Sequence, residues 1–276
     1  CDRFCSYCTI PYIRGRYHSF PYEQIAEDVE REIASGAREI VLIAQDTGRW
    51  GADLPDGRDL AWLVDTLAEA HPDTWFRIMY LQPEGATDEL LSVMAARENV
   101  CSYLDIPLQH VSKPILRAMN RRGDAAAFRA LIERIEAAVP DITLRTTLIA
   151  GFPGETDEQF EELLDFVSEG LFHYVGVFPY SREEGTTAFD LPNQIDEETK
   201  QRRADHSQHR RKKFRLPAFA LHTAGVGVVP DLQHLTLVLV VPEPEGVVRL
   251  QLQPPTVGVQ LHQIAVAART PAVAGG

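Results

Sequence analysis

The chain has 276 residues, 45% of them hydrophobic, and a formal net charge of −13. This length suits one large domain or a domain with a small appendage, and the apolar fraction allows a sizeable core. The acidic balance argues against a large nucleic-acid-binding surface, and no apolar run is long enough to span a bilayer. Three of the four cysteines gather at one end, which is typical of a reducing compartment, so we expect a cytoplasmic protein.

Helix and strand patterns alternate over the first two hundred residues. A helix is expected after Pro21, with Ile25 and Val29 on one face and Gly36 at its end. The continuous apolar run that follows, 39–44, predicts a strand buried on both faces of a parallel sheet. The same alternation predicts helices near 60–70, 87–96, 113–119, 125–139, 156–169 and 196–213, and strands near 75–81, 103–108, 142–150 and 172–178.

Strands that alternate with helices at this period predict an α/β fold built from parallel β/α units. About five strands can be counted, and a closed barrel needs eight, so we expect an open, partial β/α barrel over residues 1–206. From 207 to 276 acids nearly vanish, and prolines interrupt two short β-like runs, 235–241 and 247–252. This tail is either a small β-rich domain or a segment without a fold, and the sequence does not decide between them.

Three thiols open the chain, at Cys1, Cys5 and Cys8. Thiolates at this density are soft ligands that suit iron–sulfur clusters, zinc or copper(I). A cubane [4Fe–4S] cluster normally takes four cysteines, so three nearby thiols would leave one iron open to another ligand. A structural zinc ion would need a fourth ligand close by, for which His18 is the nearest candidate. A disulfide is disfavoured, because only Cys101 remains to pair and we expect it in the core.

Polar residues follow two of the predicted strands, at the ends where β/α barrels carry their sites. Gln45 and Asp46 come directly after the first apolar run. Asp46 would either contact a ligand or serve as a hydrogen-bonded structural residue. Gln109 and His110 follow the third strand, where they would face the mouth of the barrel and could contact a ligand.

Arg145 lies inside the fourth predicted strand, where a buried charge needs a partner. That partner would be the carboxylate of a ligand, or else Asp105 or Asp46 in the chain itself. The turn from Gly151 to Glu155 then opens a helix, and its glycines would let a ligand approach backbone donors at the helix N-terminus.

Five stretches together are similar to one family. They are Cys-Asp-Arg-Phe-Cys-Ser-Tyr-Cys-Thr-Ile-Pro at 1–11, Ile-Ala-Gln-Asp-Thr at 43–47, Tyr-Leu-Asp-Ile-Pro-Leu-Gln-His-Val-Ser at 103–112, Thr-Leu-Ile-Ala-Gly-Phe-Pro-Gly-Glu-Thr at 147–156 and Phe-Pro-Tyr-Ser-Arg-Glu-Glu-Gly-Thr at 178–186. Residues 1 to about 205 thereby resemble the radical-SAM methylthiotransferase family. Asp-Ile-Pro-Leu-Gln-His looks like its RimO type, which modifies an aspartate of a small-subunit ribosomal protein, whereas the MiaB type modifies tRNA.

This resemblance implies a [4Fe–4S] cluster on Cys1, Cys5 and Cys8, with S-adenosylmethionine (SAM) as methyl donor and source of a 5′-deoxyadenosyl radical. It also implies a small-subunit ribosomal protein as substrate and a reducing electron donor, with no membrane and no direct nucleic-acid binding by this core. The residues expected to bind the cofactor are Tyr7, Gln45, Arg145, Gly151 and Glu155, and those expected to bind the substrate are Asp46, Gln109 and His110.

The chain departs from the family pattern at both ends. An amino-terminal domain with three further cysteines, and the first barrel strand, would come before Cys1, so a second [4Fe–4S] cluster is expected only in the full-length protein. Residues after about 207 do not resemble the family's small β-barrel TRAM domain. We therefore expect this chain alone to lack full activity. The alternatives are a tRNA methylthiotransferase and, in another class, a zinc-stabilised binding module.

Overall fold

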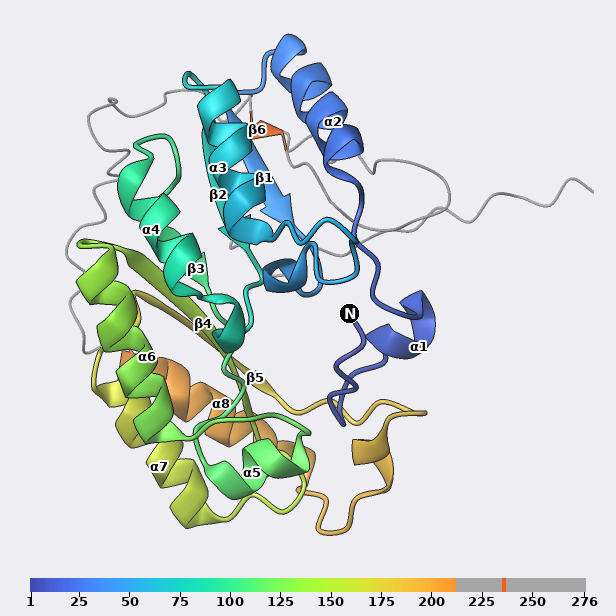
Figure 1. Ribbon diagram of the computed structural model, residues 1–276. Coiled ribbons are helices and arrows are strands. Elements are labelled where there is room, and N and C mark those ends of the chain that lie inside the picture. The colour runs from blue at the N-terminus through green and yellow to red at the C-terminus, as the bar shows by residue number, and fades with distance from the viewer. Residues whose placement is uncertain (212–234, 237–276) are drawn as a thin grey trace, which may run out of the picture.

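A computed structural model describes residues 1–211 and 235–236 (Figure 1). The strands are β1 (Glu39–Ile43), β2 (Trp75–Met79), β3 (Tyr103–Asp105), β4 (Thr143–Ala150), β5 (Tyr174–Pro179) and β6 (Leu235–Thr236). The α-helices are α1 (Ile10–Arg14), α2 (Tyr22–Ala34), α3 (Leu60–Ala70), α4 (Asp88–Ala96), α5 (Lys113–Ala118), α6 (Ala125–Ala138), α7 (Asp157–Ser168) and α8 (Glu197–Arg211). Three 3-10 turns are η1 (Thr47–Arg49), η2 (Pro83–Gly85) and η3 (Thr187–Asp190). The predicted alternation of strands and helices is confirmed.

All the paired strands run parallel. β2, β1 and β6 form one sheet in that order, and β3, β4 and β5 form a second. Backbone hydrogen bonds join the two sheets: the N–H of Cys101 donates to the carbonyl oxygen of Phe76 (2.8 Å), and that of Leu81 to Asp105 (2.9 Å). Among the described residues no strand pairing closes a ring, so the predicted partial barrel is confirmed.

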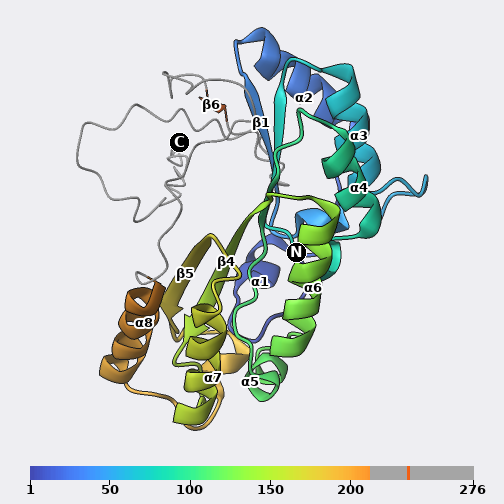
Figure 2. The ribbon, with the colours of Figure 1, turned by 90° about the vertical axis from the view of Figure 1, so that its left-hand side faces the viewer.

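The core lies between the strands and the helices that cover one side of them (Figure 2). Ile25 and Val29 are buried on one face of α2, as their spacing predicts. Side chains cap several helix starts in the expected way. Asp59 accepts a hydrogen bond from the N–H of Trp62, and Thr156 forms a reciprocal capping box with Gln159. At these helices the start is therefore set by local sequence.

Strand β3 ends at Asp105, three residues before the predicted end. Pro107 has no backbone N–H, so it cannot donate to a neighbouring strand. The N–H of Leu108 donates to Thr146 Oγ1 instead (3.3 Å), and pairing returns only at one bridge between Gln109 and Leu148. Gln109 takes a positive φ of 73°, and this turn leads the chain to His110.

The open edge of β1 pairs with β6, with Leu235 opposite Glu39 and Thr236 opposite Ile40. The remainder of the β-like run 235–241, and the whole run 247–252, lie outside the described residues. The predicted division at 206 and 207 therefore stays a prediction.

None of the helices in the described part combines the length and the apolar character needed to cross a membrane.

We expect Leu144→Ala to lower the free energy of unfolding by about 2–5 kcal/mol, because Leu144 is fully buried near the start of β4 and its loss leaves a cavity. Leu131→Ala is the matched control, since Leu131 is only partly buried on α6. Urea unfolding of both variants measures the difference. Equal losses would contradict this placement of the core.

Candidate active site

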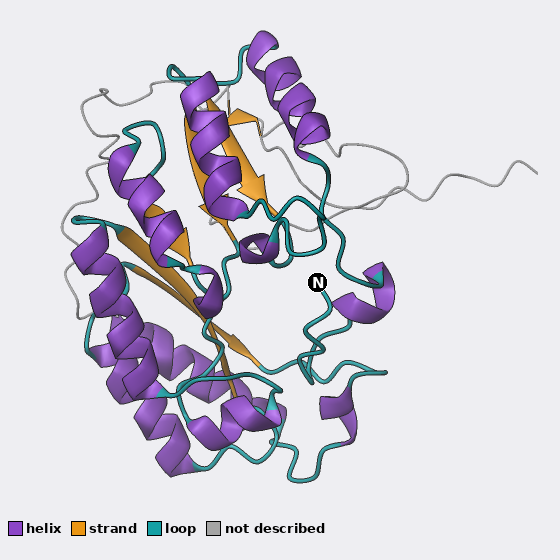
Figure 3. Cartoon of the chain, viewed as in Figure 1, coloured by secondary structure: helices purple, strands orange, loops and turns teal. Residues whose placement is uncertain are grey.

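The cysteine loop, residues 1–9, lies on the side of the sheet toward which the strand arrows point (Figure 3). Its middle is held by Ser6, which is buried. The Ser6 N–H donates to the carbonyl of Met119 (3.0 Å), and its hydroxyl donates to that of Ala118 (2.8 Å). The N–H of Ala188 in turn donates to the Ser6 carbonyl (2.7 Å). The end of α5 and η3 therefore fix the loop from one side.

A second set of contacts ties the loop to the end of β1. Arg3 Nε donates to Asp46 Oδ2 at 2.7 Å, and Arg3 Nη1 lies 3.3 Å from Glu84 Oε2. Asp2 pairs with Arg49 of η1. The Asp46 side chain is fully buried, and its Oδ1 has no hydrogen-bond partner among the described residues. Asp46 thus has a structural partner together with one unused acceptor.

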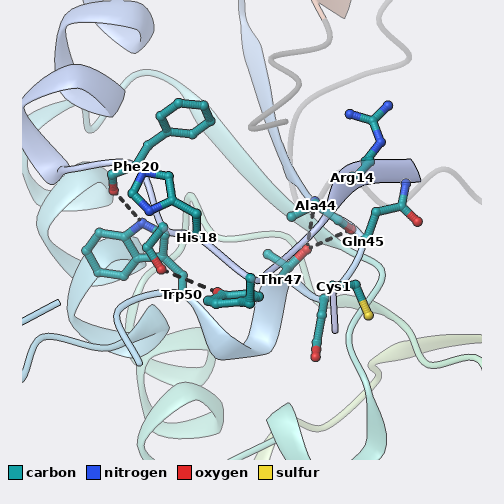
Figure 4. Close-up of a pocket in the computed structure, with 11 residues that line it drawn as sticks. Cys1, Arg14, His18, Phe20, Ala44, Gln45, Thr47 and Trp50 are labelled. Carbon is teal, nitrogen blue, oxygen red and sulfur yellow. Dashed lines mark hydrogen bonds between the residues drawn. The ribbon is translucent and has the colours of Figure 1, made fainter. Parts of the chain in front are cut away.

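A pocket of about 480 Å³, partly open to solvent, lies where the loop meets the end of β1 (Figure 4). Its lining brings together Cys1, Gln45 and Asp46 with the rings of Tyr17 and Trp50. Two of the residues predicted to bind ligand after β1 therefore lie beside the first thiol. Their roles stay predictions.

Arg145 on β4 pairs with Asp105, one of the two in-chain partners considered from the sequence. Its Nη1 lies 2.8 Å from Oδ2 of Asp105, a side chain that is almost fully buried. Burial raises the pKa of Asp105, and the neighbouring Arg145 opposes this rise. The Arg145 side chain keeps 33% exposure. A carboxylate ligand for Arg145 stays a prediction.

His110 and Glu155 lie inside the protein. The His110 side chain is fully buried, its Nδ1 accepts the N–H of Ser112 (2.9 Å), and its Nε2 lies 3.4 Å from Glu155 Oε2. Glu155 Oε2 also accepts the N–H of Gly151 (2.9 Å), and its Oε1 pairs with Arg203 Nη1 (2.7 Å). These contacts bind the loops after β3 and β4 to α8. Direct contact of His110 with substrate, or of Glu155 with cofactor, stays a prediction.

Gly151 and Gln109 are the other predicted site residues at these strand ends. Gly151 has a φ of 77°, and a Cβ there would lie 2.5 Å from Cγ of the buried Lys200, so only glycine fits. The Gln109 side chain is partly exposed, beside the buried His110.

The thiols differ in their surroundings, although all four cysteines are free and partly exposed. Burial raises the pKa of Cys8, so its thiol must lose its proton against that shift when it binds metal. Tyr7 is partly buried against a small apolar cluster, and this burial raises its pKa above the ordinary range. The guanidinium of Arg121 reaches the same place: its Nη1 lies 4.0 Å from Cys5 Sγ.

Arg121 and Arg203 are residues that the sequence patterns did not single out. Both lie in charged stretches typical of a solvated surface, and each meets its site partner across more than 40 positions of sequence. Arg203 had one indirect signal: a buried acid such as Glu155 requires a cation somewhere in the chain.

No group of three or more His, Cys, Asp or Glu side chains among the described residues is arranged to hold a single metal ion. A zinc ion would need its sulfur ligands all about 2.3 Å from one point. A cubane cluster places a separate iron at each thiolate, so it does not require this convergence. The described residues give the zinc alternative no support.

The structure is a parallel, open β/α sheet with three free thiols at its carboxyl edge, which defines a partial-barrel protein. Residues 1–167 match the Radical SAM superfamily. The chain belongs to this superfamily, which implies a [4Fe–4S] cluster and SAM.

The chain is also similar to curated proteins named ribosomal protein uS12 methylthiotransferase RimO. It is 49% identical to the one from Syntrophus aciditrophicus and 47% identical to the one from Geobacter sulfurreducens, each over 203 residues. These matches cover 74% of this chain and 45% of each relative, so the chain spans about half the length of the relatives.

Solved structures of radical SAM proteins share the fold. Coproporphyrinogen III oxidase (HemN) from Escherichia coli matches with a TM-score of 0.54 and 18% identity, over 77% of this chain and 50% of that one. The methyltransferase TsrM from Kitasatospora setae matches with a TM-score of 0.55 and 18% identity, over 68% and 36%.

We expect Arg203→Met to lower the free energy of unfolding by about 3–5 kcal/mol, because it leaves the Glu155 side chain buried without its cation. Arg202→Met is the matched control: Arg202 is exposed on the same helix, and a loss below about 0.5 kcal/mol is expected there. Chemical denaturation compares the two. A small loss for both would show that the Glu155 pair does not exist in solution.

The raised pKa of Asp105 predicts a pH dependence of stability. Between its ordinary pKa and the raised one, the folded state binds more protons than the unfolded state. The free energy of unfolding therefore falls as pH rises through that window, and Asp105→Asn should remove this part of the slope. Asp73→Asn, at an exposed position, should leave the slope unchanged. Denaturation at a series of mildly acidic pH values measures both, and an unaltered slope in Asp105→Asn would contradict the assignment.

Proposed function

We propose that this chain is the radical-SAM core of a methylthiotransferase that adds a methylthio group to the β-carbon of an aspartate in a small-subunit ribosomal protein. The observation that carries the proposal is the set of three free thiols on a loop fixed at the carboxyl ends of the strands. The similarity to RimO proteins supports the choice of reaction and substrate. Because the chain spans only part of those relatives, the complete reaction belongs to the longer protein.

The residues present fit a [4Fe–4S] cluster. The donors are soft, free and partly exposed, and they share one short loop. Cys1, Cys5 and Cys8 would each hold one iron and leave one iron for SAM. When bound, the cluster supplies the electron that cleaves SAM and so releases a 5′-deoxyadenosyl radical. A second [4Fe–4S] cluster, the source of the transferred sulfur, is expected only in the full-length protein.

The pocket beside Cys1 is the place we assign to the ligand. Gln45 offers an amide at its wall for the cofactor, and Asp46 offers the unused acceptor Oδ1 for the substrate. The exposed part of the Arg145 guanidinium can meet a carboxylate while Asp105 holds its other side. Tyr17 and Trp50 add aromatic side chains to the lining of this pocket.

The contacts of Glu155 inside the protein help to position the loops that border the site. Glu155 accepts the Gly151 N–H, and its carboxylate lies 3.4 Å from Nε2 of His110. These two loops follow β3 and β4, so Glu155 sets the shape of the mouth at which Gln109 is partly exposed. We assign Tyr7 to the same supporting layer, beside Cys5. A low-potential electron donor and a cytoplasmic location complete the proposal.

We expect the anaerobically reconstituted chain to hold about four iron and four sulfide per molecule, and its dithionite-reduced form to give an EPR signal that SAM alters. Cys5→Ser should lose the signal, whereas Cys101→Ser should keep it, because Cys101 precedes β3 at the far end of the strands. A zinc-loaded, colourless protein would contradict the proposal. So would a signal that survives in Cys5→Ser.

The substrate is tested with the longer protein that contains this core. Mass spectrometry should find one methylthio group on an aspartate of a small-subunit ribosomal protein, and none on tRNA incubated in parallel. The variant Cys5→Ser of that longer protein is the control for enzyme-dependent modification. Modification of tRNA alone would contradict the substrate assignment and leave the radical-SAM chemistry in place.

A further inference from the structure

Arg121 lies on the segment that supports the cysteine loop from the α5 side. Its Nη2 donates to the carbonyl oxygen of Pro107 (2.7 Å), and its backbone N–H donates to that of Leu116 (2.7 Å). Its Nη1 lies 4.0 Å from Cys5 Sγ. The neighbouring residue, Asn120, donates from its amide nitrogen to the carbonyl of Phe4 (3.0 Å). These contacts therefore hold the Arg121 guanidinium in a fixed position relative to the cysteine loop.

In the described part of the chain, the charge of Arg121 has no carboxylate partner. Arg3, Arg145 and Arg203 each form an ion pair, but within residues 1–207 no carboxylate lies at ion-pairing distance from Arg121. The titratable groups that face it are Cys5 and Tyr7 on the cysteine loop. The residue is partly buried, where charges interact more strongly than in bulk water.

We propose that Arg121 raises the reduction potential of the cluster held by Cys1, Cys5 and Cys8. This inference rests on the proposed function. Reduction adds one electron to the cluster, taken from a low-potential donor, and forms or breaks no bond. A fixed positive charge and a hydrogen bond at a ligand sulfur both favour the more negative, reduced form. Arg121 is thus a residue that tunes the cluster, and its partners Pro107 and Leu116 hold the tuning charge in place.

The test is a potentiometric titration of the reconstituted full chain with dithionite, followed by EPR, with iron content measured for every variant. Arg121→Gln removes the charge but keeps a polar amide side chain at this position. We expect it to shift the reduction equilibrium at least about tenfold toward the oxidised form, which is 59 mV for a one-electron couple. Arg121→Lys keeps the charge and should stay within about threefold of the parent chain.

Arg122→Gln is the matched control, because it makes the same charge change at an exposed neighbouring position. It should leave the potential close to that of the parent. The proposal is overturned if Arg121→Gln shifts the potential no more than Arg122→Gln does. Equal shifts in Arg121→Gln and Arg121→Lys would also overturn it, because they would indicate an altered loop and not a lost charge.

The iron content shows whether each variant holds the cluster. If Arg121→Gln fails to hold iron, Arg121→Met serves as the second variant without charge. If neither neutral variant holds the cluster while Arg121→Lys does, the charge is needed for assembly, and the proposed effect on potential is wrong. Failure of the parent chain itself to hold iron would instead count against the proposed function.

Discussion

The cysteine loop has little regular structure of its own, so its position depends on contacts with distant parts of the chain. Ser6 is held by backbone groups at the end of α5 and at η3. On the other side, Arg3 reaches the buried Asp46 after β1. These anchors come from both sheets of the open barrel. The three thiols can therefore keep one arrangement only while the two sheets keep theirs.

Two ionic contacts, each with a buried carboxylate, shape the strand ends around this loop. Arg145 pairs with Asp105 between β4 and β3, and Arg203 pairs with Glu155 between α8 and the loop after β4. Buried pairs add little net stability, because removing both charges from water costs about as much as their attraction returns. Their value here is geometric. Glu155 also holds Gly151 and faces His110, so α8 helps to position two loops at the mouth of the barrel.

Local patterns were enough to predict the alternating fold, because strand runs and helix caps are encoded over a few neighbouring residues. The apolar run at β1 and the capping box at Thr156 are examples. Strand β3 was predicted to continue through Pro107, but it ends at Asp105. The effect of Pro107 on strand pairing is also local.

The candidate site was only partly predictable. The thiols and the polar residues after β1 could be found from their order in the sequence, and the pocket brings Cys1 and Gln45 together. Contacts between residues that are far apart in the sequence could not be found in this way. Besides a ligand carboxylate, Arg145 had two candidate partners in the chain, Asp105 and Asp46, and only the register of β3 against β4 brings Asp105 to it. In the sequence Arg121 has the pattern of an exposed charge, and only the fold places the cysteine loop beside it.

The central claim is that the thiols of this loop hold a cluster with one iron that binds SAM directly. Electron–nuclear double resonance on the reduced, reconstituted chain tests it, with SAM labelled by nitrogen-15 at its amino group. A nitrogen-15 coupling large enough to require a bond from the amino nitrogen to iron is expected, and it should be absent when unlabelled SAM is used. A cluster signal with no such coupling at saturating SAM would contradict it.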